Sequence, residues 1–171
     1  MKRFISILLM MILVVTSFAS TAFVAEAEET LYVSGDYKYR FAVGTKIEIA
    51  EYKGKSEKLV IPQAIDGHTV IGIGKNAFAG NDKLLSLTIP NTVTYIDDFA
   101  FLYCSEMTSV KLPDNLEKIG KGAFSYCFSL TGINLPTTLK SIGDLAFTEC
   151  SEIKTMYIPI NCQEIGKGAF C

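Results

Sequence analysis

The chain has 171 residues, 20% of them charged, with a net charge of −2 at pH 7. That length allows one domain with a sizeable core. No block of basic residues occurs beyond the first three positions. The composition therefore argues against nucleic acid and against anionic membranes as partners.

Residues 1–27 have the layout of a secretory signal peptide. Lys2 and Arg3 precede the apolar run 4–15, and small residues lead to Ala25-Glu26-Ala27, the usual form of a cleavage site. A spanning helix is the alternative, but it needs about 20 apolar residues, and residues 16–21 include four Ser and Thr. We predict a secreted or cell-surface protein that is not inserted in a membrane once the signal is removed. Its net charge is then about −3, because Lys2, Arg3 and Glu26 are lost.

Residues 28–58 predict an N-terminal β-hairpin cap. Tyr37, Tyr39, Phe41 and Val43 alternate with more polar residues, and Gly44-Thr45 then turns the chain into a second alternating segment. This is the pattern of an amphipathic hairpin, and a repeat array needs its apolar end covered. A hairpin that binds a ligand is the alternative.

A repeat of 23 residues fills residues 59–171. Ala-Phe pairs recur at that spacing, and an apolar residue followed by proline precedes each pair. The first of the five units carries five extra residues around Asp66-Gly67-His68, and the last is incomplete. The pairs begin at Ala77, Ala100, Ala123, Ala146 and Ala169.

Each position of the unit has a physical task. In the third unit, Val110 and Leu112 alternate with polar neighbours as in a strand with one face inward, and Pro113 ends that strand. Leu116 and Ile119 return to the core from the opposite wall, and Gly120 is expected at a tight corner with positive φ. The phenylalanines should form an aromatic ladder.

These units predict a solenoid, because one coil alone cannot close its apolar faces. The fold class is an α/β-type but mostly-β, right-handed leucine-rich repeat solenoid with a parallel sheet on one face. The chain ends one residue after Phe170, so we expect either a truncated chain or an uncapped end that associates with another copy.

The unit from Leu130 to Cys150, L-x-x-I-x-L-P-x-x-L-x-x-I-G-x-x-A-F-x-x-C, resembles the BspA-like leucine-rich repeat family. The resemblance covers 59–171, with small departures such as Asp97 for Gly and Asn81 for Cys. It implies an extracellular surface protein, often bacterial, that binds host proteins or other cells. A repeat scaffold does not itself identify a ligand.

The residues able to do chemistry are few. Cys104, Cys127 and Cys150 lie 23 apart and predict a column of buried thiols; disulfides between neighbouring coils or a metal site are the alternatives. Cys162 is expected to pack in the core, and Cys171 to be exposed and reactive. The single histidine, His68, follows a tight turn, and no nucleophile motif accompanies it. We predict no enzyme activity and no cofactor.

The outward-facing residues of the strand segments form the predicted binding surface. They are mixed, small and polar, with one aromatic residue, and we expect them to recognise an extracellular protein or glycan, such as host matrix or another cell. The alternative is a spacer or attachment segment of a larger secreted protein. The residues of this predicted surface are Ser86, Thr88, Ser109, Lys111, Asn134, Thr155 and Tyr157.

Overall fold

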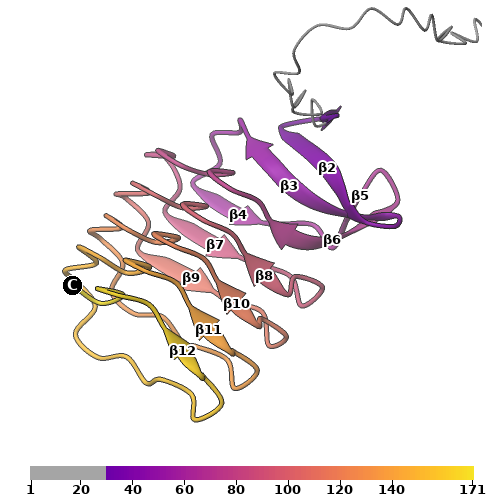
Figure 1. Cartoon of the computed structure of the whole chain (residues 1–171). Coiled ribbons are helices and arrows are strands. Elements are labelled where there is room, and N and C mark those ends of the chain that lie inside the picture. Colours follow the sequence, from indigo (N-terminus) through magenta and orange to yellow (C-terminus); the bar gives the residue numbers. More distant parts are fainter. Residues whose placement is uncertain (1–29) are drawn as a thin grey trace, which may run out of the picture.

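Successive units fold into turns of a coil that stack along one axis, as Figure 1 shows in a computed structural model. The structure describes residues 30–171, so the predicted signal peptide lies outside the described residues. The described chain is a mostly-β solenoid of about five turns with no helix, and hence none that could span a membrane. The expected α/β character is wrong in this respect: turns, not helices, connect the short strands.

Parallel strands run along two walls of the coil, whereas one sheet was expected. The larger sheet has the order β1-β2-β3-β6-β8-β10-β11-β12, with β5 paired to β6, and the smaller has the order β4-β7-β9. The larger sheet contains β1 (Tyr32–Ser34), β2 (Tyr37–Val43), β3 (Lys46–Tyr52), β5 (Ala64–Ile65), β6 (His68–Ile73), β8 (Tyr95–Ile96), β10 (Lys118–Ile119), β11 (Ser141–Ile142) and β12 (Glu164–Ile165). The smaller contains β4 (Lys58–Val60), β7 (Ser86–Thr88) and β9 (Ser109–Lys111).

The expected strand of each unit pairs only in the first three coils, which is the main correction to the sequence-based fold. In the last two units residues 132–134 and 155–157 are not strands, and Ile158, expected to face the core, is 40% exposed. The second apolar segment of the unit, Leu-x-x-Ile, instead forms the strand that pairs with the neighbouring coils. Ile119, for example, lies opposite Ile96 and Ile142. The handedness of the coil stays a prediction.

An aromatic ladder runs through the core, as expected from the Ala-Phe spacing. The rings of Phe78, Phe101 and Phe124 are fully buried, and successive centroids are 5.1 Å apart. Phe147 and Phe170 continue the ladder at 5.4 and 5.7 Å, and Phe170 is 43% exposed. Offset stacking of this kind stabilises by about 0.5–1.5 kcal/mol per pair beyond area burial.

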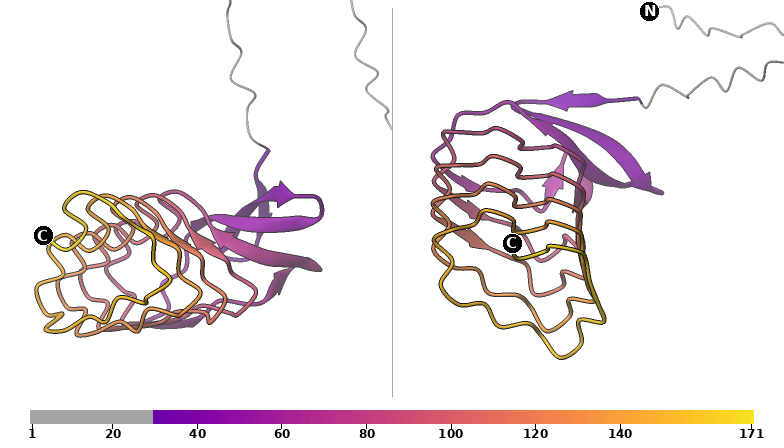
Figure 2. Two further views of the ribbon diagram at one scale, coloured as in Figure 1. Left: turned by 60° about the horizontal axis from the view of Figure 1, so that its bottom comes forward. Right: turned by 60° about the vertical axis from the view of Figure 1, so that its left-hand side comes forward.

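The hairpin of β2 and β3 is present and continues the solenoid at one end (Figure 2). Strand β3 pairs in parallel with β6, with Ile49 opposite Ile73, so it stands where the strand of a preceding coil would lie. The ring of Tyr52 stacks on Phe78 at 5.1 Å and thus begins the aromatic ladder. The other half of the hairpin extends past the core, because Phe41 and Val43 are 41% and 68% exposed.

The glycines at the corner of each coil are needed for a reason other than the one expected. Gly120 and Gly143 do not have positive φ. A Cβ added at Gly143 would instead lie 2.5 Å from the backbone C of Gly120 and the N of Lys121 in the preceding coil. At these glycines the backbones of two coils approach closely, and an added side chain would force them apart, although the second unit accommodates Asp97 at the equivalent position.

Positive φ occurs two residues later, where large and small side chains alternate from coil to coil. Phe99 (φ 58°) and Leu145 (φ 56°) alternate with Gly122 (φ 57°) and Gly168 (φ 64°). A Cβ at Gly122 would meet the ring of Phe99 at 2.6 Å, and one at Gly168 would meet Leu145 at 2.9 Å. Each large side chain thus occupies the space that the glycine of the next coil leaves open.

The residue before this position alternates in charge in the same rhythm. Asp98 and Asp144 each accept a hydrogen bond from a backbone N–H of the next coil, at Lys121 (2.8 Å) and Lys167 (2.6 Å). The corner therefore repeats every two coils, although the unit repeats every coil.

Gly143→Ala should lower the free energy of unfolding by about 1–3 kcal/mol, because the added methyl group forces two backbones apart. Gly132→Ala is the matched control: nothing lies within 4 Å of the added Cβ, so its effect should stay within about 1 kcal/mol and favour folding. Denaturant unfolding of both variants measures this. Equal losses at the two positions would contradict a role for close approach.

Candidate functional site

The outer face of β4, β7 and β9 carries four of the seven predicted surface residues in two straight columns. Ser86 lies opposite Ser109, and Thr88 lies opposite Lys111. The residues between them, such as Val110, are buried, so the alternation places the polar side chains outward. The structure therefore brings these four predicted residues together on one surface.

Two further residues, which the sequence analysis missed, extend these columns. Lys58 lies opposite Ser86, and Val60 lies opposite Thr88. Both are exposed, Val60 by 72%. The five-residue insertion between the first two prolines hid their register with the later units, although the Ile-Pro that follows them was a signal.

The other three predicted residues lie beyond the last strand of this wall. Asn134, Thr155 and Tyr157 are exposed, and Tyr157 is 88% exposed. A hollow of about 490 Å³ separates the third coil from the fourth here, with Lys111, Asp114 and Asn134 in its lining. Glycine weakens a strand and offers no side chain to pack, and Gly132 is the first residue of the unpaired segment that follows β9.

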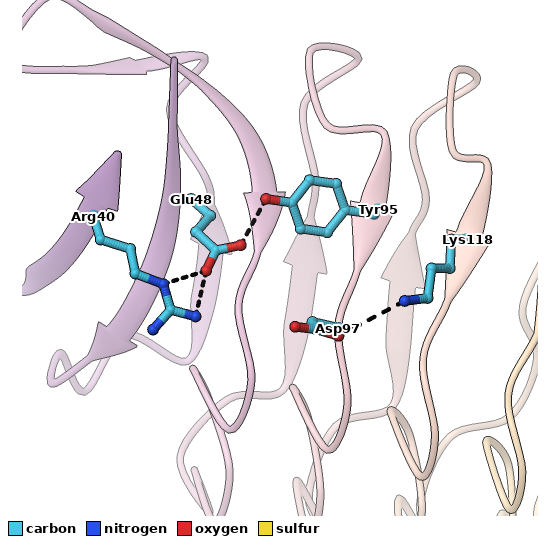
Figure 3. A network of polar contacts seen from close by, with 5 residues as sticks. All are labelled: Arg40, Glu48, Tyr95, Asp97 and Lys118. Atoms are coloured by element: carbon cyan, nitrogen blue, oxygen red, sulfur yellow. Dashed lines mark hydrogen bonds and ion pairs between the residues drawn. The ribbon is translucent and has the colours of Figure 1, made fainter. Parts of the chain in front are cut away.

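A row of polar residues crosses the outer face of the larger sheet, and the sequence did not indicate it. Strand pairing places Arg40 beside Glu48, and places Gly72 between Glu48 and Tyr95. The ring of Tyr95 lies over Gly72, where a Cβ would overlap it. Residues from β2, β3 and β8 thereby come within contact, as Figure 3 shows.

Glu48 is the centre of this network, although it is only 7% exposed. Its Oε1 accepts hydrogen bonds from the Arg40 guanidinium at 2.5 Å, and its Oε2 accepts one from the Tyr95 hydroxyl at 2.6 Å. Burial and then the Glu48 carboxylate raise the pKa of Tyr95 well above its ordinary value. The phenol therefore stays protonated and donates to the carboxylate.

A stacked pair of tyrosines, one exposed and one half-buried, is a further feature that the sequence prediction missed. The rings of Tyr103 and Tyr126 stack with centroids 4.4 Å apart and an interplanar angle of 5°. Both residues have positive φ, 57° and 61°, which costs about 1–2 kcal/mol for a side chain with a Cβ. The tyrosine that precedes cysteine in two successive units was the only signal in the sequence.

The cysteine column is buried and its thiols are free, as predicted from the sequence. Cys104, Cys127 and Cys150 donate to the carbonyl oxygens of phenylalanines 26 residues earlier, at 3.2, 3.3 and 3.0 Å. In the slot before them, the side-chain oxygen of Asn81 accepts from turn backbone N–H groups. Each thiol therefore links its own turn to the backbone of the preceding coil. Cys162 packs partly buried against the core, and Cys171 is exposed.

His68 sits in a tight turn with Asp66 and Gly67, both at positive φ. Its Nδ1 is 3.1 Å from the Thr45 carbonyl oxygen, and its ring packs edge-on against Phe41 at 4.8 Å. Across residues 30–171, no three His, Cys, Asp or Glu side chains gather in a way that could hold a metal ion.

The buried thiols should make stability fall at alkaline pH. Burial raises the pKa of Cys104 from 9.0 to about 12. The neutral thiol is thus favoured in the folded state, and its contribution is complete below pH 9 and lost as pH rises towards 12. Between these values the wild type should lose up to about 1.4 kcal/mol per pH unit more than Cys104→Val, as measured by urea unfolding. Parallel pH profiles of the two proteins would contradict this.

The fold and its repeat define a class of protein, the leucine-rich repeat solenoids. Residues 71–171 match the model of the BspA type leucine-rich repeat region, in six copies. The chain belongs to this family, as its Leu-Pro, Ile-Gly and Ala-Phe positions indicated.

Solved structures of bacterial leucine-rich repeat proteins share this fold. The T. pallidum protein TpLRR is 33% identical with a TM-score of 0.78, over 82% of this chain and 66% of that one. A leucine-rich repeat protein from Bacteroides ovatus is 31% identical with a TM-score of 0.70, over 81% of this chain and 38% of that one. A leucine-rich cell surface protein from Faecalibacterium prausnitzii is 25% identical with a TM-score of 0.63, over 82% and 52%.

This chain therefore spans from 38% to 66% of the length of these relatives. A comparison with curated proteins gave no match.

Proposed function

We propose that the protein is an exported surface module that binds another extracellular protein. The binding surface is the outer face of β4, β7 and β9, together with the adjoining exposed residues Asn134, Thr155 and Tyr157. The family, and the relative described as a cell surface protein, support a location outside the cell, as does the signal-peptide pattern of residues 1–27. The role is binding, with no catalytic step.

The observation that carries this proposal is the register of the two polar columns. Ser86 with Ser109 and Thr88 with Lys111 form a continuous face on paired strands, so their spacing is fixed before a partner binds. A backbone whose spacing is already fixed loses little conformational entropy on association. An open, extended strand face of short side chains suits contact with another protein, and repeat arrays commonly bind through such surfaces.

Lys111→Glu combined with Tyr157→Ala should reduce capture of the partner at least tenfold. The change reverses a charge within the face and removes its most exposed aromatic ring, which is a common type of binding hot spot. A pull-down from extracellular matrix and cell-surface proteins, followed by quantitative binding of the captured protein, measures the effect. Lys75→Glu/Tyr103→Ala is the matched control, since both residues are exposed outside the face. Unchanged capture by the first variant would favour a spacer role.

The hairpin of β2 and β3 acts in this proposal as the cap of the first coil. Ile47 and Ile49 are completely buried, and Tyr52 is 8% exposed between the rings of Tyr37 and Phe78. These side chains cover apolar surface that the first coil would otherwise present to water.

Tyr52→Ala should therefore destabilise the whole solenoid by about 3–5 kcal/mol, as for removal of a buried aromatic side chain. Tyr157→Ala, at a highly exposed position, should change stability by less than about 0.5 kcal/mol. Thermal and urea unfolding measure both. A small effect of Tyr52→Ala would indicate that the hairpin folds beside the solenoid without covering it.

A further inference from the structure

A hollow of about 430 Å³ lies at the N-terminal end of the solenoid, between the hairpin and the first coil. Its volume is within the range of small-molecule sites, about 300–1,000 Å³. It lies on the inner side of β4, because Leu59 lines it, whereas Lys58 and Val60 on either side of Leu59 are exposed and point outward. The hollow is therefore separate from the proposed protein-binding face.

The side chains that the hairpin contributes to the hollow come from one side of its sheet. Ser34 lies opposite Tyr37, and Tyr37 lies opposite Tyr52, and directly opposed residues point to the same side of a sheet. The rings of Tyr37 and Tyr52 meet with centroids 5.0 Å apart. One ligand in the hollow can therefore contact these side chains together.

Two carboxylates, Asp36 and Asp66, line the hollow, and its lining contains no Lys, Arg or His. Asp66 accepts hydrogen bonds from the hydroxyls of Ser34 at 2.7 Å and Tyr39 at 3.0 Å, and these neutral donors leave its charge uncompensated. Within residues 30–171, neither carboxylate forms an ion pair. The hollow is thus a place of negative charge that the described chain does not neutralise.

A tyrosine hydroxyl without a partner lies beside one of these carboxylates. Tyr52 is 8% exposed, and no group in the described part of the chain forms a hydrogen bond with its hydroxyl. That hydroxyl and the Asp36 carboxylate both lie against Gly54, with Asp36 Oδ2 at 2.8 Å from the position of an added Cβ. Burial, and then the neighbouring Tyr52 and Asp36, raise the pKa of Tyr37 to about 12. Both hydroxyls are therefore neutral at pH 7, and that of Tyr52 is available to a ligand.

We propose that this hollow binds a primary alkylammonium ion, either a free amine or the side chain of a lysine. An ammonium group carries one positive charge and three hydrogen-bond donors, which match the carboxylates of Asp36 and Asp66 and the hydroxyl oxygen of Tyr52. Its alkyl chain packs on the apolar part of the lining, which includes Leu59 and Pro62. The tyrosine rings add attraction, because the face of an aromatic ring attracts cations.

NMR titration of the isotope-labelled protein at neutral pH tests this with four compounds: pentylamine, the methylamide of Nα-acetyl-lysine, pentanol and pentanoate. Each is added to about 10 mM, a concentration that detects millimolar affinity. We expect at least one of the two ammonium compounds to shift the backbone amide signals of Asp36 and Asp66, with pentanol and pentanoate about tenfold weaker or more. A response to the lysine derivative would mean that a partner protein can supply the ligand, whereas a response to pentylamine alone would restrict the site to free amines.

Asp36→Asn and Asp66→Asn should each weaken binding of the ammonium compound about five- to tenfold, because each removes one of the two charges. Asparagine tolerates the positive φ of residue 66, 51°, so the turn is kept. Tyr52→Phe should weaken binding about fivefold, because it removes the hydroxyl oxygen and leaves the buried ring in place.

Asp82→Asn is the matched control, because it removes an exposed carboxylate outside the hollow and changes the net charge equally. It should leave ammonium binding unchanged, and circular dichroism should show that all four variants are folded. Absence of a response to both ammonium compounds, equal binding of pentanol, binding that survives all three hollow variants, or an equal loss in Asp82→Asn would each overturn the proposal. None of these results bears on protein capture by the face of β4, β7 and β9, so the two sites succeed or fail independently.

Discussion

Close approach of neighbouring backbones is the constraint on which the whole solenoid depends. Each coil bonds to the next at several points around its turn; for example, the N–H of Phe101 donates to the carbonyl of Ala123 and that of Gly120 to the carbonyl of Ile96, both at 2.8 Å. At that separation, each position of the unit sits directly over its equivalent. Many positions therefore hold either a side chain that stacks well on a copy of itself, as phenylalanine does, or no side chain, as at most of the corner positions.

The period and the core could be predicted from the sequence because stacking demands near-identical residues at fixed spacing. Phe78 to Phe170, the buried thiols and Leu116 with Ile119 are all where the repeat indicated. The hairpin was also visible, since Gly44-Thr45 separates two alternating segments. The role of Tyr52 could not be predicted in this way. Its ring stacks on Phe78 as a repeat phenylalanine would, but the residues around it do not follow the repeat pattern.

What the sequence could not give depends on interactions that leave no period. Pairing along the smaller wall stops at β9, within a repeat that otherwise fits, and Gly132 is the one strand-weakening residue at that point. The corner glycines looked like positive-φ residues, whereas two-residue offsets place that conformation at Gly122 and Phe99. The contact of Glu48 with Tyr95 spans 47 residues and joins the hairpin to the repeats, so neither element alone suggested it.

From Phe99 onward, the alternation along the corner makes a pair of coils the structural building block, whereas the first coil has Asn76 at this position. Phe99 covers Gly122, and Asp98 accepts a hydrogen bond from the backbone N–H of Lys121. In the coil that contains Lys121 and Gly122, the same two positions thus hold a basic residue and a glycine instead of an acidic and a large residue. Loss or gain of a single 23-residue unit would set two large or two glycine positions against each other, while a change by 46 residues would keep them matched.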